Sequence, residues 1–282
     1  MIAVVDYQKG NLKSVERGLI AAGGEALITA DASEIAKADA IVLPGVGAFA
    51  DAAATMCELG QMEAIRDRVR AGVPFLGICL GEHLMFEHGV EGAPEGNPAC
   101  GLGLLPGTVV AMPRYDAQGK TFKVPHVGWN TIEMPVCNGG ATVPLCGEGG
   151  GNAALSSGGA GGGAARSSAA KRGLFEHGAF PGSTPRPGGE FAFPDSTPQP
   201  GSDLAFACPL FDGIAPGEYF YFTHSFIAPT GSHTIAETTH STRFTSAVQF
   251  GDRAFGVQFH PEKSSDAGAR VLANFVAIAA RG

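Results

Sequence analysis

The first 135 residues alternate between short apolar runs and segments whose apolar residues recur at helical spacing. Runs of four or five mostly apolar residues predict strands at 2–6, 26–29, 40–43 and 75–78. Apolar positions three and four residues apart predict helices at 11–22, 48–59, 62–71 and 80–87. Strands that alternate with helices in this way indicate βαβ units and a mostly parallel sheet that is covered on both faces.

The C-terminal third of the chain has a different pattern. Short β-rich runs separated by turn residues predict strands at 219–223, 234–239, 247–250 and 255–259. Helical spacing of apolar residues then predicts a last helix over residues 265–280. The predicted fold is therefore a three-layer α/β fold, with helices on both faces of a mostly parallel sheet and some antiparallel strands late in the chain.

Residues 137–204 interrupt both patterns. This segment of 68 residues contains 17 Gly and 7 Pro, and it has no sustained apolar period. Such a composition buries too little apolar surface to offset the entropy of an ordered chain. We predict a single domain over residues 1–282, interrupted by a disordered Gly- and Pro-rich insertion at 137–204. A docking segment around 171–180 is the alternative interpretation of this stretch.

Composition and charge exclude several classes of protein. Hydrophobic residues make up 44% of the chain, which is enough for a buried core, and the net charge of −8 argues against nucleic acid or an anionic membrane surface as the main partner. No apolar run reaches the ~18 residues needed to span a bilayer, and no signal peptide is visible at the N-terminus. We therefore expect a soluble cytoplasmic protein that does not bind a membrane.

The six cysteines show no pattern of a metal or disulfide framework. None of them forms a C-x2-C pair, and no His completes a zinc-finger spacing. The His83 and His88 side chains are five residues apart, so they diverge around a helix, unlike the i, i+4 pair of a zinc helix. We expect no metal site and no cofactor.

One cysteine lies in a pattern that indicates a nucleophile. The segment Gly77–Gly81 (GICLG) follows the strand predicted at 75–78 and leads into a predicted helix, which is the context of a nucleophile elbow. Small residues two positions away on each side allow the strained turn, and the helix N-terminus favours a thiolate at Cys79. The alternative is a buried structural cysteine whose flanking glycines allow close packing.

A second pattern supplies groups that such a nucleophile needs. His260 follows the strand predicted at 255–259, and Glu262 comes two residues later. A catalytic thiol needs a base that takes and returns its proton, and the imidazole needs a third group to fix its tautomer. A His-x-Glu pair alone is a weak signal, but with an elbow cysteine it makes Cys79, His260 and Glu262 a candidate catalytic triad.

The pairing of GICLG with a late FHPE resembles the triad (class I) glutamine amidotransferases. Six segments are similar, in the same order, to the glutaminase subunits of imidazole glycerol phosphate synthase: VVDYQKGNLKSV, LPGVGAF, GLGLLPG, VPHVGWN, YFYFTHS and GVQFHPEKSS. All six lie outside the predicted insertion. The resemblance implies that Cys79 attacks the side-chain amide of L-glutamine and that His260, oriented by Glu262, acts as base and then as acid.

The same resemblance implies the surroundings of the triad. Backbone groups of an oxyanion hole and side chains at the bound glutamine would come from Val46, Gly47, Leu80, His83, Ser225 and Phe226. Ammonia would pass to a cyclase subunit, a (β/α)8 barrel, which forms a heterodimer with this chain and makes imidazole glycerol phosphate and an aminoimidazole carboxamide ribonucleotide in histidine biosynthesis. Residues at the interface with that subunit would be Asn11, Trp129 and Lys263.

The chain departs from the family at the helix after the nucleophile. The family pattern reads G-x-C-x-G-M-Q, whereas Glu82 and His83 stand in the last two positions here. A neutral His offers one donor and one acceptor, so the substitution is expected to weaken glutamine binding. Two other interpretations follow: a subunit that binds the cyclase but has little glutamine turnover, and a different class I amidotransferase or cysteine hydrolase of the same fold.

Overall fold

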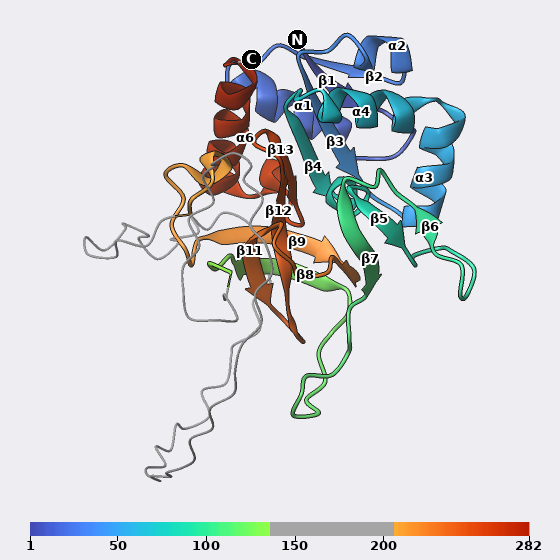
Figure 1. Cartoon of the computed structure of the whole chain (residues 1–282). Helices are drawn as coiled ribbons and strands as arrows, with labels where there is room; N and C mark the ends of the chain where they lie inside the picture. The colour runs from blue at the N-terminus through green and yellow to red at the C-terminus, as the bar shows by residue number, and fades with distance from the viewer. Residues whose placement is uncertain (136–205, 282) are drawn as a thin grey trace, which may run out of the picture. The chain divides into compact units, whose positions relative to one another are not determined.

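The computed structural model describes residues 1–135 and 206–281, which belong to one compact unit (Figure 1). The insertion predicted at 137–204 and its possible docking segment lie outside the described residues. Within the described ranges, no helix has both the length and the apolar character needed to cross a membrane.

A central sheet of seven strands organises this unit, in the order β11-β12-β13-β4-β3-β1-β2. Five neighbouring strands are parallel: β13 (Ala254–Val257), β4 (Phe75–Cys79), β3 (Ala40–Gly45), β1 (Ile2–Val5) and β2 (Ala26–Thr29). Two antiparallel strands complete one edge: β12 (Arg243–Phe250) and β11 (Thr234–Thr239). The predicted mostly parallel sheet with late antiparallel strands is therefore confirmed.

Alternation along the strands divides the core into two layers. Ile2 and Val4 of β1 pack on one face with α1 (Leu12–Ala21) and α6 (Ser265–Ala279). Neighbouring strand residues such as Val5 turn to the other face. The helices packed there are α2 (Ala32–Ile35), α3 (Phe49–Glu58) and α4 (Gln61–Arg70). Because helices cover both faces, the inner parallel strands β1, β3, β4 and β13 are buried on both sides, whereas the edge strand β2 is only partly buried.

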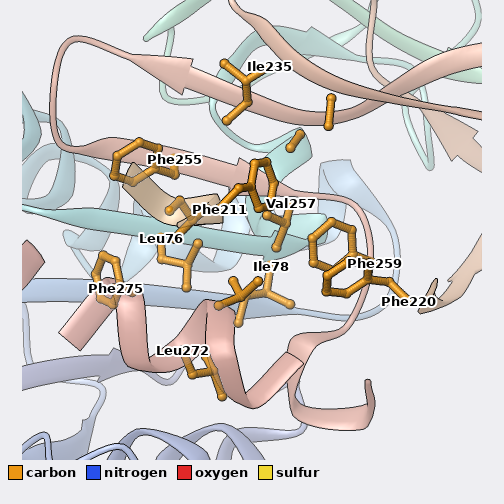
Figure 2. Packing of buried hydrophobic residues seen from close by; sticks show 14 of the residues in the cluster. Leu76, Ile78, Phe211, Phe220, Ile235, Phe255, Val257, Phe259, Leu272 and Phe275 are labelled. Carbon is orange, nitrogen blue, oxygen red and sulfur yellow. The ribbon is translucent and has the colours of Figure 1, made fainter. Parts of the chain in front are cut away.

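The core around β4 holds the centre of the sheet rigidly. Leu76 and Ile78 of β4 share one buried cluster with Leu272 and Phe275 of α6 (Figure 2). Phe211, in a 3-10 turn at Pro209–Phe211, belongs to the same cluster. Each fully buried side chain of this size contributes roughly 1.5–3 kcal/mol relative to an exposed one. The carboxyl end of β4 is therefore a well-fixed point from which a side chain can be aimed.

Two smaller sheets lie beyond the carboxyl ends of the parallel strands (Figure 1). One has the order β10-β7-β5-β6 and consists of β10 (Phe226–Ile227), β7 (Leu105–Ala111), β5 (Phe86–Gly89) and β6 (Ala99–Cys100). The other is an antiparallel pair of β8 (His126–Thr131) and β9 (Tyr219–His224). Together they bring chain segments from the middle and the end of the sequence to the carboxyl end of the central sheet.

The helix predicted at 80–87 is wrong in its second half. Helix α5 covers only Leu80–His83, and β5 begins at Phe86. Strand β5 pairs with β7 in parallel and with β6 in antiparallel register, so distant partners decide the conformation of these residues. The short helix α2 was not anticipated, and β13 ends at Val257, earlier than the predicted 255–259.

Candidate active site

Cys79 occupies a strained turn at the junction of β4 and α5. Its φ is 56° and its ψ is −108°, a conformation that costs a non-glycine residue of order 1–3 kcal/mol. A Cβ at Gly81 would overlap the carbonyl oxygen of Leu43, and a Cβ at Gly77 would overlap the backbone of Gly81. Glycine at both positions is therefore required for the strand and the helix to approach each other at this turn.

His260 and Glu262 reach the same place because β13 is the neighbour of β4. Val257 is in register with Ile78, so the residues after β13 emerge beside the turn that holds Cys79. His260 Nδ1 lies 3.0 Å from Glu262 Oε1, and both side chains are almost fully buried. Asn11 donates its side-chain amide to the same Oε1 at 3.3 Å. Since Nδ1 is occupied, Nε2 is the ring nitrogen left for the Cys79 thiol.

The charges of this pair support one another. Burial alone would lower the pKa of His260, but its interactions with Cys79 and Glu262 outweigh that effect and raise the pKa to about 9. Burial would likewise raise the pKa of Glu262, but the hydrogen bond from His260 and its positive charge bring the pKa below its ordinary value. At neutral pH the pair is therefore an imidazolium and a carboxylate, an arrangement suited to a neighbouring thiolate.

A cleft of about 410 Å³ opens over Cys79. All six residues predicted to form the oxyanion hole and the substrate site line it, together with Cys79 and His260: Val46, Gly47, Leu80, His83, Ser225 and Phe226. Its remaining lining residues are Ala48, Glu91, Pro125, Thr223 and His224. A volume of a few hundred Å³ is typical of sites for small molecules.

A larger hollow of about 580 Å³ lies at the opposite ends of the parallel strands, where Ile2, Ala40 and Pro74 line it. It contains none of the predicted site residues. Open α/β sheets bind their ligands outside the carboxyl ends of the strands, so the smaller cleft at Cys79 is the better candidate.

The loop after β3 forms one wall of the cleft. Gly47 has a φ of 97°, which favours glycine over any other residue. A Cβ at Gly45 would lie 2.6 Å from the hydroxyl of the buried Tyr7 and 2.7 Å from Cβ of Leu80. Glycine at the end of β3 thus lets this strand and the loop after it lie against the start of α5.

Gln258 is a polar contact of the thiol to which the sequence analysis assigned no role. Its Nε2 donates to Cys79 Sγ at 3.7 Å, and its Oε1 lies 2.7 Å from Nε2 of His83. A signal was available in the sequence, because Gln258 lies in the strand predicted at 255–259, two residues before His260, and alternation there predicts that the two side chains share a side. Burial lowers the pKa of His83 to about 4, against the opposing effect of this hydrogen bond, so the ring is neutral.

Two glutamates near the cleft were also not assigned a role from the sequence. Glu91 follows β5, is half-buried, and lines the cleft; burial is the main reason that its pKa is raised. Glu82 on α5 is fully buried, neither carboxyl oxygen has a hydrogen-bond partner among the described residues, and burial raises its pKa well above the ordinary value. Only the fold gives these positions, since Glu91 lies in a loop without a motif.

The three predicted interface residues lie outside the cleft but close to its components. Asn11 reaches Glu262, as described above, and Lys263 directly follows that carboxylate in the chain. The Lys263 ammonium lies 5.8 Å from the ring centre of Tyr221, which in turn makes an edge contact with Trp129 at 6.0 Å. In the described part of the chain, no group of three or more His, Cys, Asp or Glu side chains is arranged to hold a metal ion.

Comparison with known proteins agrees with this geometry. The family "Glutamine amidotransferase class-I" matches residues 3–139 and 196–279. "Imidazole glycerol phosphate synthase subunit HisH" of Moorella thermoacetica is 35% identical over 97% of this chain and 93% of its own length. The protein of the same name from Syntrophotalea carbinolica is 32% identical over 98% of both chains. A crystal structure of a glutamine amidotransferase superimposes with a TM-score of 0.56 at 15% identity, over 99% of this chain and 98% of that one, which supports the fold alone.

Proposed function

Because this chain belongs to the class I glutamine amidotransferase family, and within it to the HisH subunits of imidazole glycerol phosphate synthase, we propose that it hydrolyses glutamine with a Cys79-His260-Glu262 triad. The observation that supports the proposal is that Cys79 and His260 line one cleft at the carboxyl ends of two adjacent parallel strands, with the Glu262 carboxylate 3.0 Å from the His260 ring. The elbow at Cys79 and the ion pair behind it are the parts that acyl transfer requires.

The reaction follows from the positions of these groups. The Cys79 thiolate attacks the side-chain carbonyl carbon of glutamine, and the C–N bond breaks as His260 gives its Nε2 proton to the leaving nitrogen. Ammonia and a γ-glutamyl thioester result. Water then attacks the thioester while His260 takes its proton, and glutamate leaves as the thiolate is restored. Glu262 holds the imidazole in the required orientation at both steps.

The cleft offers each part of glutamine a partner. Backbone N–H groups of the Val46–Gly47 loop and of Leu80 would stabilise the oxyanion, and one such donor is worth ~3–4 kcal/mol in comparable acyl transfer. The carboxylate of Glu91 at the cleft suits the α-ammonium of the substrate. Ser225 and Phe226 line the wall where the backbone groups of glutamine would lie.

The outer face of the β8–β9 pair is suited to the partner cyclase. Alternation turns Phe220 and Phe222 into the core and leaves Val127, Trp129 and Tyr219 about half exposed. Aromatic residues with a nearby cation are typical anchors of protein interfaces. We propose that this face and Lys263 dock on a (β/α)8 cyclase subunit in a heterodimer, so that ammonia passes directly into histidine biosynthesis in the cytoplasm.

The substitution at His83 motivates a second candidate, a subunit that binds the cyclase but hydrolyses glutamine poorly. The neutral His83 ring gives its Nε2 hydrogen to Gln258, so only Nδ1 remains, as an acceptor. A glutamine amide at the same position would offer both a donor and an acceptor to the substrate. Glutamine binding would therefore depend more on Glu91 and the backbone groups in this chain.

Glutamate release from glutamine tests both candidates. The purified full chain is assayed alone, with the cyclase subunit, and with the cyclase subunit and its phosphoribulosyl aminoimidazole-carboxamide nucleotide. Turnover that needs the partner and disappears in Cys79→Ser is the expected result. A stable complex without turnover would favour the binding subunit, and recovery of activity in His83→Gln would then identify the cause.

A further inference from the structure

Two successive hydrogen bonds connect His83 of helix α5, through Gln258, to the sulfur of Cys79. His83 Nε2 and Gln258 Oε1 are 2.7 Å apart, and Gln258 Nε2 is 3.7 Å from Cys79 Sγ. Gln258 has no exposed surface, so water does not compete for either end of its amide. Its backbone N–H donates to the Ser246 carbonyl at 3.0 Å, which fixes the base of the side chain.

The two ends of the amide are not equivalent toward sulfur. An N–H aimed at Sγ stabilises a thiolate, whereas a carbonyl oxygen in the same place would repel it. The Thr223 carbonyl oxygen, 3.9 Å from Sγ, already accepts from the protonated thiol and so favours that form. The Thr223 carbonyl thus favours the thiol form of Cys79. The Gln258 amide favours the thiolate only when its NH2 group, and not its oxygen, faces Sγ.

His83 holds this orientation when its ring hydrogen is on Nε2. Its neutral ring carries one N–H, and the bond to Gln258 Oε1 places that hydrogen on Nε2. With Oε1 held at His83, the NH2 end of the amide is directed at Cys79. Loss of the donor at position 83 would leave the amide free to turn its oxygen toward the sulfur.

We propose that Gln258 is a further catalytic residue, which donates its amide N–H to the Cys79 thiolate, and that His83 is the positioning residue that holds this amide in place. These hydrogen bonds stabilise the Cys79 thiolate both before it attacks the substrate and when it is released from the thioester. Its importance for turnover rests on the proposed function, but its effect on the thiol does not.

Of the titratable groups around the thiol, His260 is the one that stabilises the thiolate by its charge. His260 supplies a positive charge from the segment after β13. Tyr7 after β1 and His83 on α5 are neutral near pH 7, and so is His224 on β9, whose pKa burial lowers well below its ordinary value. Glu91 lines the same cleft and, when charged, disfavours the thiolate. Among the described residues, Gln258 is thus the neutral donor that adds to His260.

The test is the pH dependence of Cys79 alkylation by iodoacetamide in the full chain, without glutamine. The modified peptide that contains Cys79 is quantified by mass spectrometry, which separates it from the other cysteines. Gln258→Met is expected to raise the apparent thiol pKa by about one unit and to slow alkylation at pH 7 several-fold. His83→Leu is expected to raise it by a smaller amount, and His83→Gln, whose amide can donate to Gln258, restores the original value.

Gln249→Met is the matched control, because Gln249 lies on β12 and donates its side chain to the Gly251 carbonyl. Its thiol pKa is expected to be unchanged. Thermal unfolding of each variant shows whether it folds, and if Gln258→Met does not, the comparison of His83→Leu with His83→Gln decides. An unchanged thiol pKa in folded Gln258→Met, or equal values in the two His83 variants, overturns the inference. A pKa shift in a chain without glutaminase activity would instead support it and refute the proposed function.

Discussion

Two carboxylates are buried within the same end of the sheet, and their surroundings are opposite. Glu262, in the turn after β13, accepts hydrogen bonds from His260 and Asn11. Glu82, on α5, has no hydrogen-bond partner for either oxygen among the described residues. Burial disfavours charge at both, but the partners of Glu262 lower its pKa, whereas the pKa of Glu82 rises. A buried acid becomes an ionised, orienting group only where the fold supplies a cation and donors.

The largest effect is expected when the partnered carboxylate loses its charge. Glu262→Gln keeps the shape of the side chain but removes the counter-charge that holds His260 as an imidazolium. We expect kcat for glutamine hydrolysis in the complex to fall about 10²- to 10⁴-fold, by analogy with comparable triads. The KM for glutamine should change little, and a fall in kcat smaller than about tenfold would show that Glu262 does not orient the base.

Removal of the Glu82 carboxyl is expected to stabilise the protein, whereas loss of the Glu262 charge is harmful. Glu82→Met removes a buried polar group that has no hydrogen bond within residues 1–135 and 206–281, and it inserts an apolar side chain of similar length. The free energy of unfolding is therefore expected to rise by about 1–3 kcal/mol. Denaturant unfolding measures this change. Glu63→Met, at an exposed position on α4, is the matched control and should have almost no effect. Destabilisation by Glu82→Met would mean that the carboxyl has a partner in solution.

The pH dependence of stability separates the two carboxyls further. The raised pKa of Glu82 stabilises the wild-type fold at low pH, and this contribution is lost as pH rises above the ordinary value near 4.5. The depressed pKa of Glu262 acts in reverse, since its contribution is present above that value and is lost as pH falls. Relative to Glu82→Gln, wild type should therefore lose about 1 kcal/mol per pH unit above pH 5, until Glu82 ionises. Relative to Glu262→Gln, it should lose stability on the acid side as pH falls below about 4.5. Parallel pH curves for wild type and the two variants would contradict this comparison.

The His260–Glu262 pair also predicts a loss of folding stability at alkaline pH. The pKa of His260 is raised to about 9, so its stabilising charge is fully present below its ordinary value of 6.5 and is lost as pH rises through 9. Unfolding of wild type and His260→Gln between pH 6 and 10 measures this contribution. A constant difference between the two proteins over that range would show that His260 is not held as an imidazolium.

The smallest effect on activity and stability is expected from loss of the hydrogen bond between Asn11 and Glu262. Asn11→Ala removes one 3.3 Å hydrogen bond to Glu262, while the bond from His260 remains. The expected cost is about 0.5–1.5 kcal/mol in stability and a few-fold fall in kcat. Asn97→Ala, in an exposed loop after β5, gives the matched control. An effect as large as that of Glu262→Gln would show that Asn11 acts through more than this bond.

The amino-acid sequence by itself determined the elements whose signals are local. Apolar runs of strand length and residues at helical spacing located the central strands and the long helices, because each of these segments buries a face that its own sequence marks. The glycines around Cys79 also predicted the turn that holds the nucleophile, since only that turn needs small residues at both positions. The six residues that line the cleft came from the family resemblance and not from local physics.

Only the tertiary structure decided what depends on partners far along the chain. Residues 86–89 became a strand because β6 and β7 pair with them, although the local pattern predicted a helix that continues to residue 87. The same long-range packing set Gln258 between His83 and Cys79 and left the Glu82 carboxyl without a hydrogen-bond partner among the described residues. A sequence specifies which side chains are polar, but their charges and roles follow from neighbours that only the folded chain brings within hydrogen-bonding distance.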